Sequence, residues 1–547
     1  MTLKHGKLLM AIATAVFLVT SACAPAAAPA PASAPTPAPT KAPAPAPAAT
    51  PAPPAGPRPG GSITVAIHTT PPSLDINGAR SGITMNVIGP TMNGLLRFDE
   101  NLEIINDAVE SWKQVDDKTY TFTLRKGVRF HDIAPVSGRE VTSADVEATV
   151  LRSKGAAPYN KFTAPHSLAK ETWSPVKSME LIDDRTIKFH LSEPSASFLN
   201  MVADPASVIY PKEGYDGKYD VRQKVIGSGP FMVTNAQPEV SFTMEKNPKY
   251  FEAGKPYLDK ITAVVIKDPS ARRAAFAAKQ VDIISSGDKD LKDQALRDVP
   301  TAHVVKTPAV TRLIAIEPKG PLANYKVRRA IFKALGPEEM LQLVAGGDGR
   351  LTMAGVVGKW SLPEQELKQL FGPDIAESKR LLQEAGYADG FNVTIRATDR
   401  QQPSVEIAQV AVNQLAKVNI KAKVEVLEFA TFLDERSKGN YEMLSHAWSW
   451  SLDPDARIAG VYLPGGSWAS PEMPEIVDLI KKQRQELDLA KRIELVHKIQ
   501  RVNVEKYLFN FNVLQTYDFD ILQGHVQGWA RPQEYFVRFA DQTWLKK

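Results

Sequence analysis

Three of the chain's eight tryptophans fall within segment 441–470, YEMLSHAWSWSLDPDARIAGVYLPGGSWAS. Trp448 and Trp450 are two residues apart, so on a β-strand their rings share one face, and the SLDPD turn would end that strand at the rim of a sheet. Aromatic faces at such a rim can form one wall of a ligand-binding site, to which Trp468 would add a third ring. Indole rings are equally typical of a hydrophobic core, so both interpretations stay open.

The sequence contains none of the familiar hydrolase or metal-site motifs. Its nine histidines include no pair at H-x-H or H-x-x-x-H spacing, and H-E-x-x-H, P-loop and G-x-S-x-G sequences are missing. His131 and His446 could each act as a base or a ligand, but an isolated histidine is more often a surface or hydrogen-bonded core residue. Asp453 and Asp455 lie in a turn, where Asp is favoured for backbone reasons, and they supply too few oxygens for calcium. We therefore expect no enzyme activity, no cofactor and no metal.

Length, charge and cysteine content narrow the class of protein. A chain of 547 residues is too long for one ordinary core and predicts two or more lobes. The 66 Lys and Arg residues outnumber the 61 Asp and Glu residues only slightly and form no basic run, so we expect no nucleic-acid partner. Cys23 is the single cysteine, and one chain can therefore build neither a disulfide nor a multi-thiolate metal site.

The amino-terminal segment has the features of an export signal followed by a tether. Two lysines precede the apolar run 8–19, which is too short to span a bilayer comfortably but suits a secretory signal, predicted over 1–22. The small residues before Cys23 resemble the lipobox of bacterial lipoproteins, which implies lipidation of Cys23 and a membrane anchor. Thr20 stands where that motif more often has Leu, and an ordinary secretory signal with an incidental cysteine is the alternative. The Pro/Ala-rich stretch 23–60 predicts an extended stalk.

The remaining chain has the pattern of an α/β protein. Segment 62–68, SITVAIH, alternates as a strand, and a ligand could meet its carboxyl end at His68. Strand, helix and strand signals follow one another in 261–284 and again in 391–426, which predicts two β-α-β units. Their separation implies two α/β lobes with a cleft between them at the strands' carboxyl ends.

Several ordered motifs together resemble one known family. GGSITVAIHTTPPSLD, LLRFDENLEIINDAVESW, YTFTLRKGVRFHD, VTSADV, GSGPF, EKNPKYFEAGKPYLDKI and VRRAIFKAL are similar to motifs of the solute-binding proteins of ATP-driven (ABC) importers, in the peptide, nickel and opine group called family 5. The likeness runs from about Gly60 to the carboxyl terminus. It implies a two-lobed, periplasmic-binding-protein-like clamshell with an extra subdomain in the first lobe, which closes on one solute and delivers it to an ABC permease.

The resemblance also implies domain boundaries. Lobe I comprises 61–99, 220–310 and 515–547, the subdomain 100–219 is inserted in it, and lobe II spans 311–514. The hinge should lie near Pro308–Leu313 and Val513–Tyr517.

The predicted ligand-binding residues depart from the peptide-binding members of the family. In those proteins the segment similar to AWSWSLDPD commonly reads W-x-A-D-Y, and its Asp holds the peptide's amino terminus; here Ser451 stands in that place, after Trp450. Asp453 could substitute only with an alignment gap, and Glu317 stands where the family usually has Asn, although it could be an exposed loop residue. The expected binding set is Trp448, Trp450, Ser451, Asp453, Trp468, Glu317 and His68.

We therefore expect an extracytoplasmic, lipid-anchored, monomeric receptor that binds a small organic solute, peptide-like or other, without making or breaking a bond. The alternatives are a nickel-complex receptor of the same family, a secreted hydrolase, and a purely structural surface lipoprotein.

Overall fold

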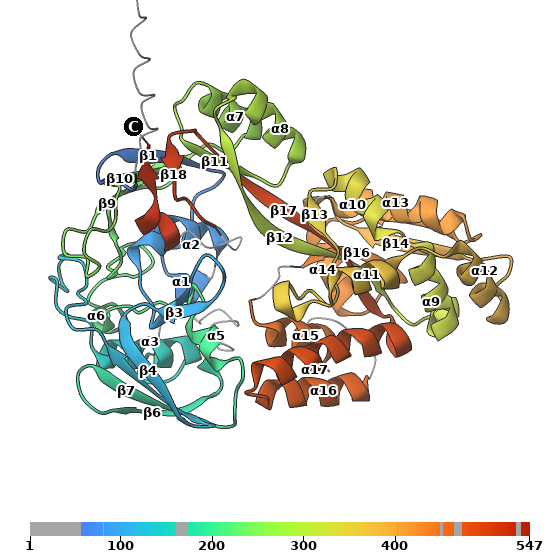
Figure 1. Cartoon of the computed structure of the whole chain (residues 1–547), viewed down its shortest axis with the longest axis horizontal. Coiled ribbons are helices and arrows are strands. Elements are labelled where there is room, and N and C mark those ends of the chain that lie inside the picture. Colours follow the sequence, from blue (N-terminus) through green and yellow to red (C-terminus); the bar gives the residue numbers. More distant parts are fainter. Residues whose placement is uncertain are drawn as a thin grey trace, which may run out of the picture. The chain divides into compact units, whose positions relative to one another are not determined.

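The computed structural model describes residues 56–79, 81–159, 173–401, 403–448, 452–463, 473–531 and 538–546 (Figure 1). Internal contacts divide the chain after Pro54, and every described residue belongs to the second unit, 55–547. The predicted signal, Cys23 and most of the stalk lie outside the described residues. Within the described ranges, no helix combines the length and apolar character needed to cross a membrane.

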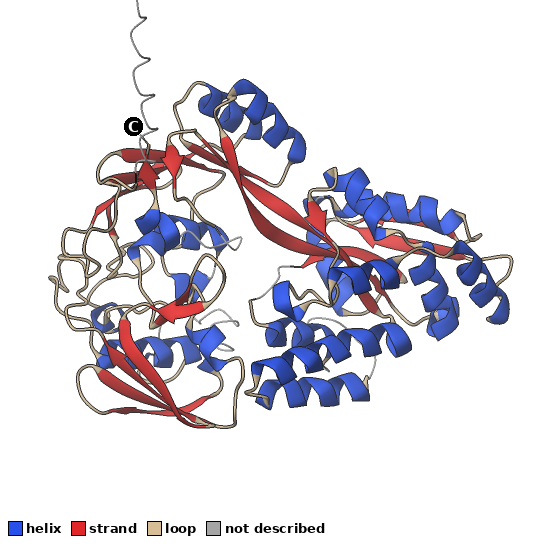
Figure 2. Ribbon diagram, in the orientation of Figure 1, coloured by secondary structure: helices blue, strands red, loops and turns tan. Residues whose placement is uncertain are grey.

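The described residues form an 11-stranded sheet in the order β15-β14-β16-β12-β17-β11-β1-β10-β9-β8, with β13 paired to β17 (Figure 2). The two long strands β12 (His303–Ile316) and β17 (Asn510–Leu522) lie in the middle and pair antiparallel, with register shifts between Pro308 and Thr311 and between Arg312 and Leu313. On one side follow β11 (Ile283–Ser286), β1 (Ser62–Ile67), β10 (Lys260–Val265), β9 (Ser241–Lys246) and β8 (Phe231–Gln237). On the other side lie β16 (Met443–Trp448), β14 (Asn392–Ala397) and β15 (Lys421–Val426), whereas the short β13 (Gly349–Arg350) pairs with β17.

Both predicted β-α-β units are confirmed. In the first, α7 (Pro269–Ala277) connects β10 to β11, and β1 lies between these strands, parallel to both. In the second, α13 (Ser404–Ala416) connects β14 to β15, which pair directly and in parallel. The carboxyl ends of β1, β10 and β11 therefore meet at one edge of the sheet, where ligands commonly bind in α/β proteins.

The chain between β12 and β17 supplies most of the helices around β14, β15 and β16. Its largest hydrophobic core includes Ile314, Ile331, Ile395, Ile407 and Leu444, all fully or almost fully buried. The helices are α9 (Tyr325–Ala334), α10 (Pro337–Ala345), α11 (Glu364–Phe371), α12 (Ile375–Glu384), α13, α14 (Phe429–Ser437), α15 (Pro454–Tyr462), α16 (Pro474–Gln485) and α17 (Leu489–Val502).

A separate four-stranded antiparallel sheet lies within the predicted subdomain, in the order β4-β5-β7-β6. The central strands β5 (Thr119–Leu124) and β7 (Thr186–Leu191) are flanked by β4 (Val109–Asp116) and β6 (Val176–Leu181). The helix α3 (Ser143–Lys154) begins with a reciprocal capping box between Thr142 and Asp145.

Short elements complete the described fold. They are α1 (Ile76–Ala79), α2 (Gly82–Ile88), β2 (Leu96–Phe98), β3 (Ile104–Asn106), α5 (Phe198–Val202), α6 (Lys212–Tyr215), α8 (Lys289–Asp298), β18 (Val526–Gln527) and β19 (Trp544–Leu545). The chain runs through β12 into the strands and helices that surround β16 and returns through β17. The domain and hinge boundaries given above stay predictions.

Candidate ligand-binding site

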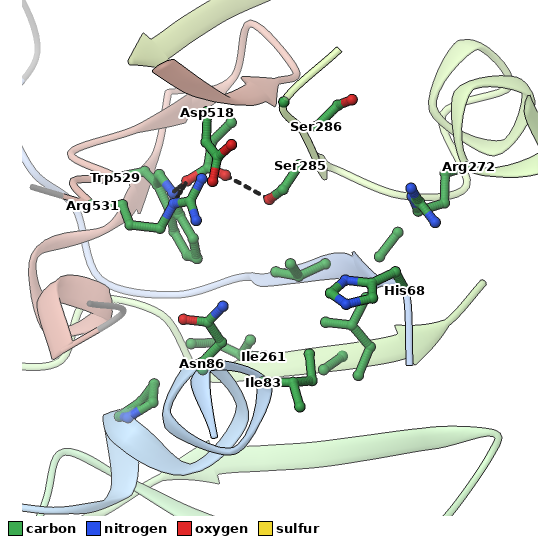
Figure 3. Close-up of a pocket in the computed structure, with 18 of the residues that line it drawn as sticks. His68, Ile83, Asn86, Ile261, Arg272, Ser285, Ser286, Asp518, Trp529 and Arg531 are labelled. Atoms are coloured by element: carbon green, nitrogen blue, oxygen red, sulfur yellow. Dashed lines mark hydrogen bonds and ion pairs between the residues drawn. The ribbon is translucent and has the colours of Figure 1, made fainter. Parts of the chain in front are cut away.

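A cavity of about 300 Å³ lies at the carboxyl end of β1, between the sheet, α2 and the segment that follows β18 (Figure 3). We call it the β1 cavity. Its apolar lining includes Val65, Ile67, Ile83, Met244, Ile261 and Trp529. Its polar lining includes His68, Asn86, Arg272, Ser285, Ser286, Asp518, Asp520 and Arg531. An apolar cavity with a few converging polar groups is the usual form of a small-molecule site.

Asp520 forms a completed hydrogen-bond network in the cavity wall. Its carboxylate is fully buried and accepts hydrogen bonds from Trp529 Nε1 at 2.8 Å and from Arg531 Nε at 2.8 Å. Ser285 Oγ donates to the other oxygen at 2.5 Å. These bonds fix the indole ring of Trp529 and the guanidinium of Arg531 in the wall, so this side of the cavity is preorganised.

Asp518 lies two residues before Asp520 on β17, and both line the cavity. No described residue donates a hydrogen bond to the Asp518 carboxylate or forms an ion pair with it. Burial raises its pKa, an effect that the charges of Arg531 and Arg312 oppose and that of Asp520 reinforces. A second cavity of about 810 Å³, lined on its far side by Arg312 and by residues of α10 and α13, also has Asp518 in its wall. Asp518 thus lines two cavities and has no hydrogen-bond donor among the described residues.

Three further polar side chains line the β1 cavity: Arg272, His68 and Asn86. Arg272 Nη1 donates to the carbonyl oxygens of Ile266 and Lys267 at 3.0 and 2.8 Å, which anchors the guanidinium just beyond β10. Desolvation, and then the charge of Arg272, lower the pKa of His68, so its imidazole is neutral near neutral pH. Asn86 Oδ1 is buried and has no hydrogen-bond partner.

Trp448 is the last residue of β16 and is half-buried. Its carbonyl accepts a hydrogen bond from Thr311 Oγ1 at 3.0 Å, and the guanidinium of Arg457 lies 5.5 Å from its ring centre. Its ring also packs against the core around β16, and it does not line the β1 cavity. Trp450, Ser451 and Trp468 lie outside the described residues, so their binding roles stay predictions.

Asp453 has a structural role, in which hydrogen bonds from other residues occupy the acceptor positions of its carboxylate. It is the N-cap of α15, where Oδ1 accepts from Asp455 N at 2.9 Å. Arg492 forms two further bonds with it, Nη1 to Oδ2 at 2.8 Å and Nη2 to Oδ1 at 2.7 Å, and Asn200 Nδ2 donates to Oδ2 at 2.8 Å. A carboxylate has about four acceptor positions, so these partners leave none for a solute. The structure therefore favours the turn interpretation of Asp453 over the expected ligand anchor.

Glu317 is not brought beside Trp448. It follows the end of β12, and in the antiparallel pair with β16 Ile316 lies opposite Met443 whereas Thr311 lies opposite Trp448. Glu317 therefore lies at the other end of this strand pair, about 20 Å away at the usual rise per residue. Of the four expected binding residues that the structure describes, Trp448, Asp453, Glu317 and His68, only His68 lines the β1 cavity.

The two histidines that could have been chemical groups are buried core residues. His131 Nδ1 accepts from Gly227 N at 3.2 Å, and its Nε2 donates to Gly229 O at 3.1 Å. His446 Nε2 is 2.9 Å from Arg436 Nη1, and burial followed by the charges of Arg436 and Arg312 lowers its pKa. Within the part of the chain that the structure describes, no three His, Cys, Asp or Glu side chains gather in a way that could hold a metal ion.

The family model "Bacterial extracellular solute-binding proteins, family 5 Middle" matches residues 103–469, more than half of the chain. The chain belongs to this family.

Relatives and solved structures agree with the family 5 assignment. The chain is 27% identical over 443 residues to "Di/tripeptide-binding protein 1" of Pseudomonas aeruginosa, covering 76% of this chain and 81% of that protein. It is 26% identical over 408 residues to "Glutathione-binding protein GsiB" of Salmonella choleraesuis, covering 72% and 77%. The solved periplasmic binding protein DppA of Helicobacter pylori, in complex with peptide STSA, has a TM-score of 0.70 at 24% identity and covers 90% of this chain and 99% of that one. The predicted two-lobed clamshell fold is therefore confirmed, and the protein is a solute-binding receptor.

The sequence interpretation of this family 5 receptor missed the acidic pair Asp518 and Asp520. A signal was present: two carboxylates at alternate positions in the apolar strand segment VLQTYDFDIL place two charges on one face of a strand. Strands at the centre of a sheet are usually apolar, so such a pair indicates either a buried polar network or a ligand site. In the structure Asp520 belongs to a buried polar network, and Asp518 lines the cavity without a donor among the described residues.

Proposed function

We propose that the receptor holds its solute in the β1 cavity and closes lobe II over it for delivery to an ABC permease. The observation that carries this proposal is the cavity at the carboxyl end of β1. There an apolar floor meets the Asp518 carboxylate, which no described residue pairs, and the wall formed by Asp520, Trp529 and Arg531. Such a half-site binds weakly alone and strongly when a second surface covers it, which suits hinge closure.

The predicted segment from Trp448 to Ser451 would supply the covering surface in this scheme. β16 is separated from β17 only by β12, so its carboxyl end belongs to the same sheet as Asp518. Di/tripeptides and glutathione, named for two relatives, make peptide-like compounds the first solutes to consider. Ser451 at the place of the family's usual Asp argues against an α-amino anchor at that position.

The proposal also includes export and anchoring. Segment 1–22 would direct the chain across the membrane, Cys23 would carry lipid, and the stalk to residue 60 would hold a monomeric receptor near its permease. Replacing Cys23 by Ser should move the protein from the membrane fraction to the soluble fraction. An unchanged distribution would contradict lipid anchoring without affecting solute binding.

Solute binding is tested by thermal melting and small-angle X-ray scattering of the purified receptor with a panel of peptides, sugars and amines. At least one class should raise the melting temperature and reduce the radius of gyration, because the closed form alone binds the solute on both sides. Calorimetry with nickel and a chelator, and turnover assays with ester and peptide substrates, test the two rival functions. A receptor that responds to no class in either measurement contradicts the proposal.

A further inference from the structure

The carboxylates of Asp518 and Asp520 line the same cavity but differ in their partners. Asp520 accepts three hydrogen bonds from Trp529, Arg531 and Ser285. Asp518 accepts none from the described residues, although it is at most half exposed. The Asp518 carboxylate lines the cavity and is partly exposed, so a solute that carries hydrogen-bond donors can reach it.

The nearby cations do not fill this role. Arg531 is engaged through Nε with Asp520, and Arg312 Nη1 donates to Gln401 O at 3.0 Å. Neither forms an ion pair with Asp518, although both lower its pKa from a distance. Arg272 is held by two carbonyl oxygens, and Figure 3 shows it well apart from Asp518.

A second acceptor lies in the same cavity. Asn86 Oδ1 is buried without a donor, and rotation of the amide about its last side-chain bond exchanges its oxygen and nitrogen. One carboxylate and one amide oxygen without donors match a group that donates several hydrogen bonds and carries positive charge. Ile83, Ile261 and Met244 line the floor, where an apolar carbon chain could lie.

We propose that Asp518 anchors a positively charged nitrogen of the solute, an ammonium or amidinium group, inside the β1 cavity. This inference rests on the proposed receptor function, because it names the chemistry of the same cavity. Asn86 assists as a neutral acceptor, and the solute's carbon chain lies on the apolar floor. The anchor is independent of the segment around Ser451, where family members carry their usual acidic residue.

The test uses three probes with the same carbon chain and different head groups: n-pentylamine, n-pentanol and n-pentanoate. Thermal melting and calorimetry of the full receptor should show the amine binding most tightly. Asp518→Asn should weaken amine binding at least about tenfold, because a charge-assisted hydrogen bond is lost. Asn86→Asp adds a carboxylate and should tighten it. Asp132→Asn, which removes an exposed carboxylate paired with Lys249, is the matched control and should change nothing.

The inference is overturned if pentanol or pentanoate binds as tightly as the amine, or if Asp518→Asn retains the wild-type affinity. It is also overturned if the receptor responds to other solutes of the panel but not to the amine; receptor function then stands. A receptor that responds to no solute of any class in melting or scattering loses the proposed function, and the inference with it. Should Asp518→Asn melt far below the wild type, Asn86→Asp decides by its gain in affinity.

Discussion

Asp453 at the start of α15 and Asp518 on β17 are both aspartates largely shielded from solvent, yet their hydrogen-bond partners differ completely. Asp453 accepts from Asp455, Asn200 and twice from Arg492, whereas Asp518 accepts from no described donor. A filled carboxylate contributes to stability and has nothing left to bind, while an open one lowers stability and is available to a ligand. The number of hydrogen-bond donors around each carboxylate, rather than the residue type, distinguishes the structural role of Asp453 from the proposed binding role of Asp518.

The Asp453 region also ties distant parts of the chain together. Arg492 Nη1 donates to Ala196 O at 3.0 Å, and Ala196 N donates to Arg484 O at 2.8 Å. Ala196 and Asn200 belong to the predicted subdomain, and Arg484 and Arg492 to α16 and α17. The Asp453 site therefore joins the segment around Ala196 and Asn200 to α15, α16 and α17.

The largest expected effect comes from a substitution that removes the hydrogen bonds between Arg492 and Asp453. Arg492→Met keeps much of the side-chain volume but leaves Asp453 buried with two donors missing, which should cost about 3–5 kcal/mol in the free energy of unfolding. Urea denaturation measures the loss. Arg222→Met, which removes the surface pair with Asp220, is the control and should cost far less. Equal losses in the two variants would remove the distinction drawn for Asp453.

The second prediction concerns His131, a buried histidine whose two ring nitrogens are both hydrogen-bonded. Burial lowers the pKa of His131 from 6.5 to about 4, so between these values the unfolded chain binds a proton that the folded chain does not. The free energy of unfolding should therefore fall on acidification through this window, by up to about 3 kcal/mol. Denaturation of the wild type and His131→Asn at several pH values measures it. The variant should be less stable near neutral pH but lose less on acidification, and parallel curves would contradict the assignment.

The third prediction concerns the stability of the open site. Asp518→Asn should change the free energy of unfolding by no more than about 1 kcal/mol, and towards higher stability near pH 7. The folded pKa of Asp518 is raised by burial, against the opposing charges of Arg531 and Arg312 and with support from Asp520. The wild type should therefore lose stability relative to the variant as pH rises through that pKa. A large destabilisation by Asp518→Asn in urea denaturation would show that Asp518 has a structural partner.

The smallest expected change in stability belongs to the predicted covering surface. Trp450→Ala should alter the free energy of unfolding by no more than about 0.5 kcal/mol while weakening solute binding and reducing the fluorescence response to solute. Thermal melting and fluorescence titration measure the two effects. A large drop in melting temperature with affinity retained would assign Trp450 to the core, like the partly packed Trp448.

Local sequence patterns were sufficient for much of the fold. Alternation and helical spacing predicted both β-α-β units. These features depend on residues close in sequence, so propensity and capping determine them.

The candidate binding site depends on pairing between strands that are far apart in the sequence, so local sequence patterns could not predict it. Asp518 reaches the β1 cavity only because β17 pairs with β11 and β11 with β1, strands far apart in the chain. Asp453 was left open between a turn residue and an anchor, and its partners Arg492 and Asn200 lie far from it in sequence. Glu317 was placed by resemblance, and the register of β12 against β16 decided its position.

β17 lies in the middle of the sheet but near the end of the chain, and this affects the order of folding. β11 and β12 both pair with β17, so the first lobe lacks a central strand until residues 510–522 are available. Such non-local pairing slows folding. We therefore expect a chain emerging from a ribosome to stay largely unfolded in this region until residues 510–522 have emerged. That delay would keep the chain in the extended state that passage through a secretion channel requires, without any added device.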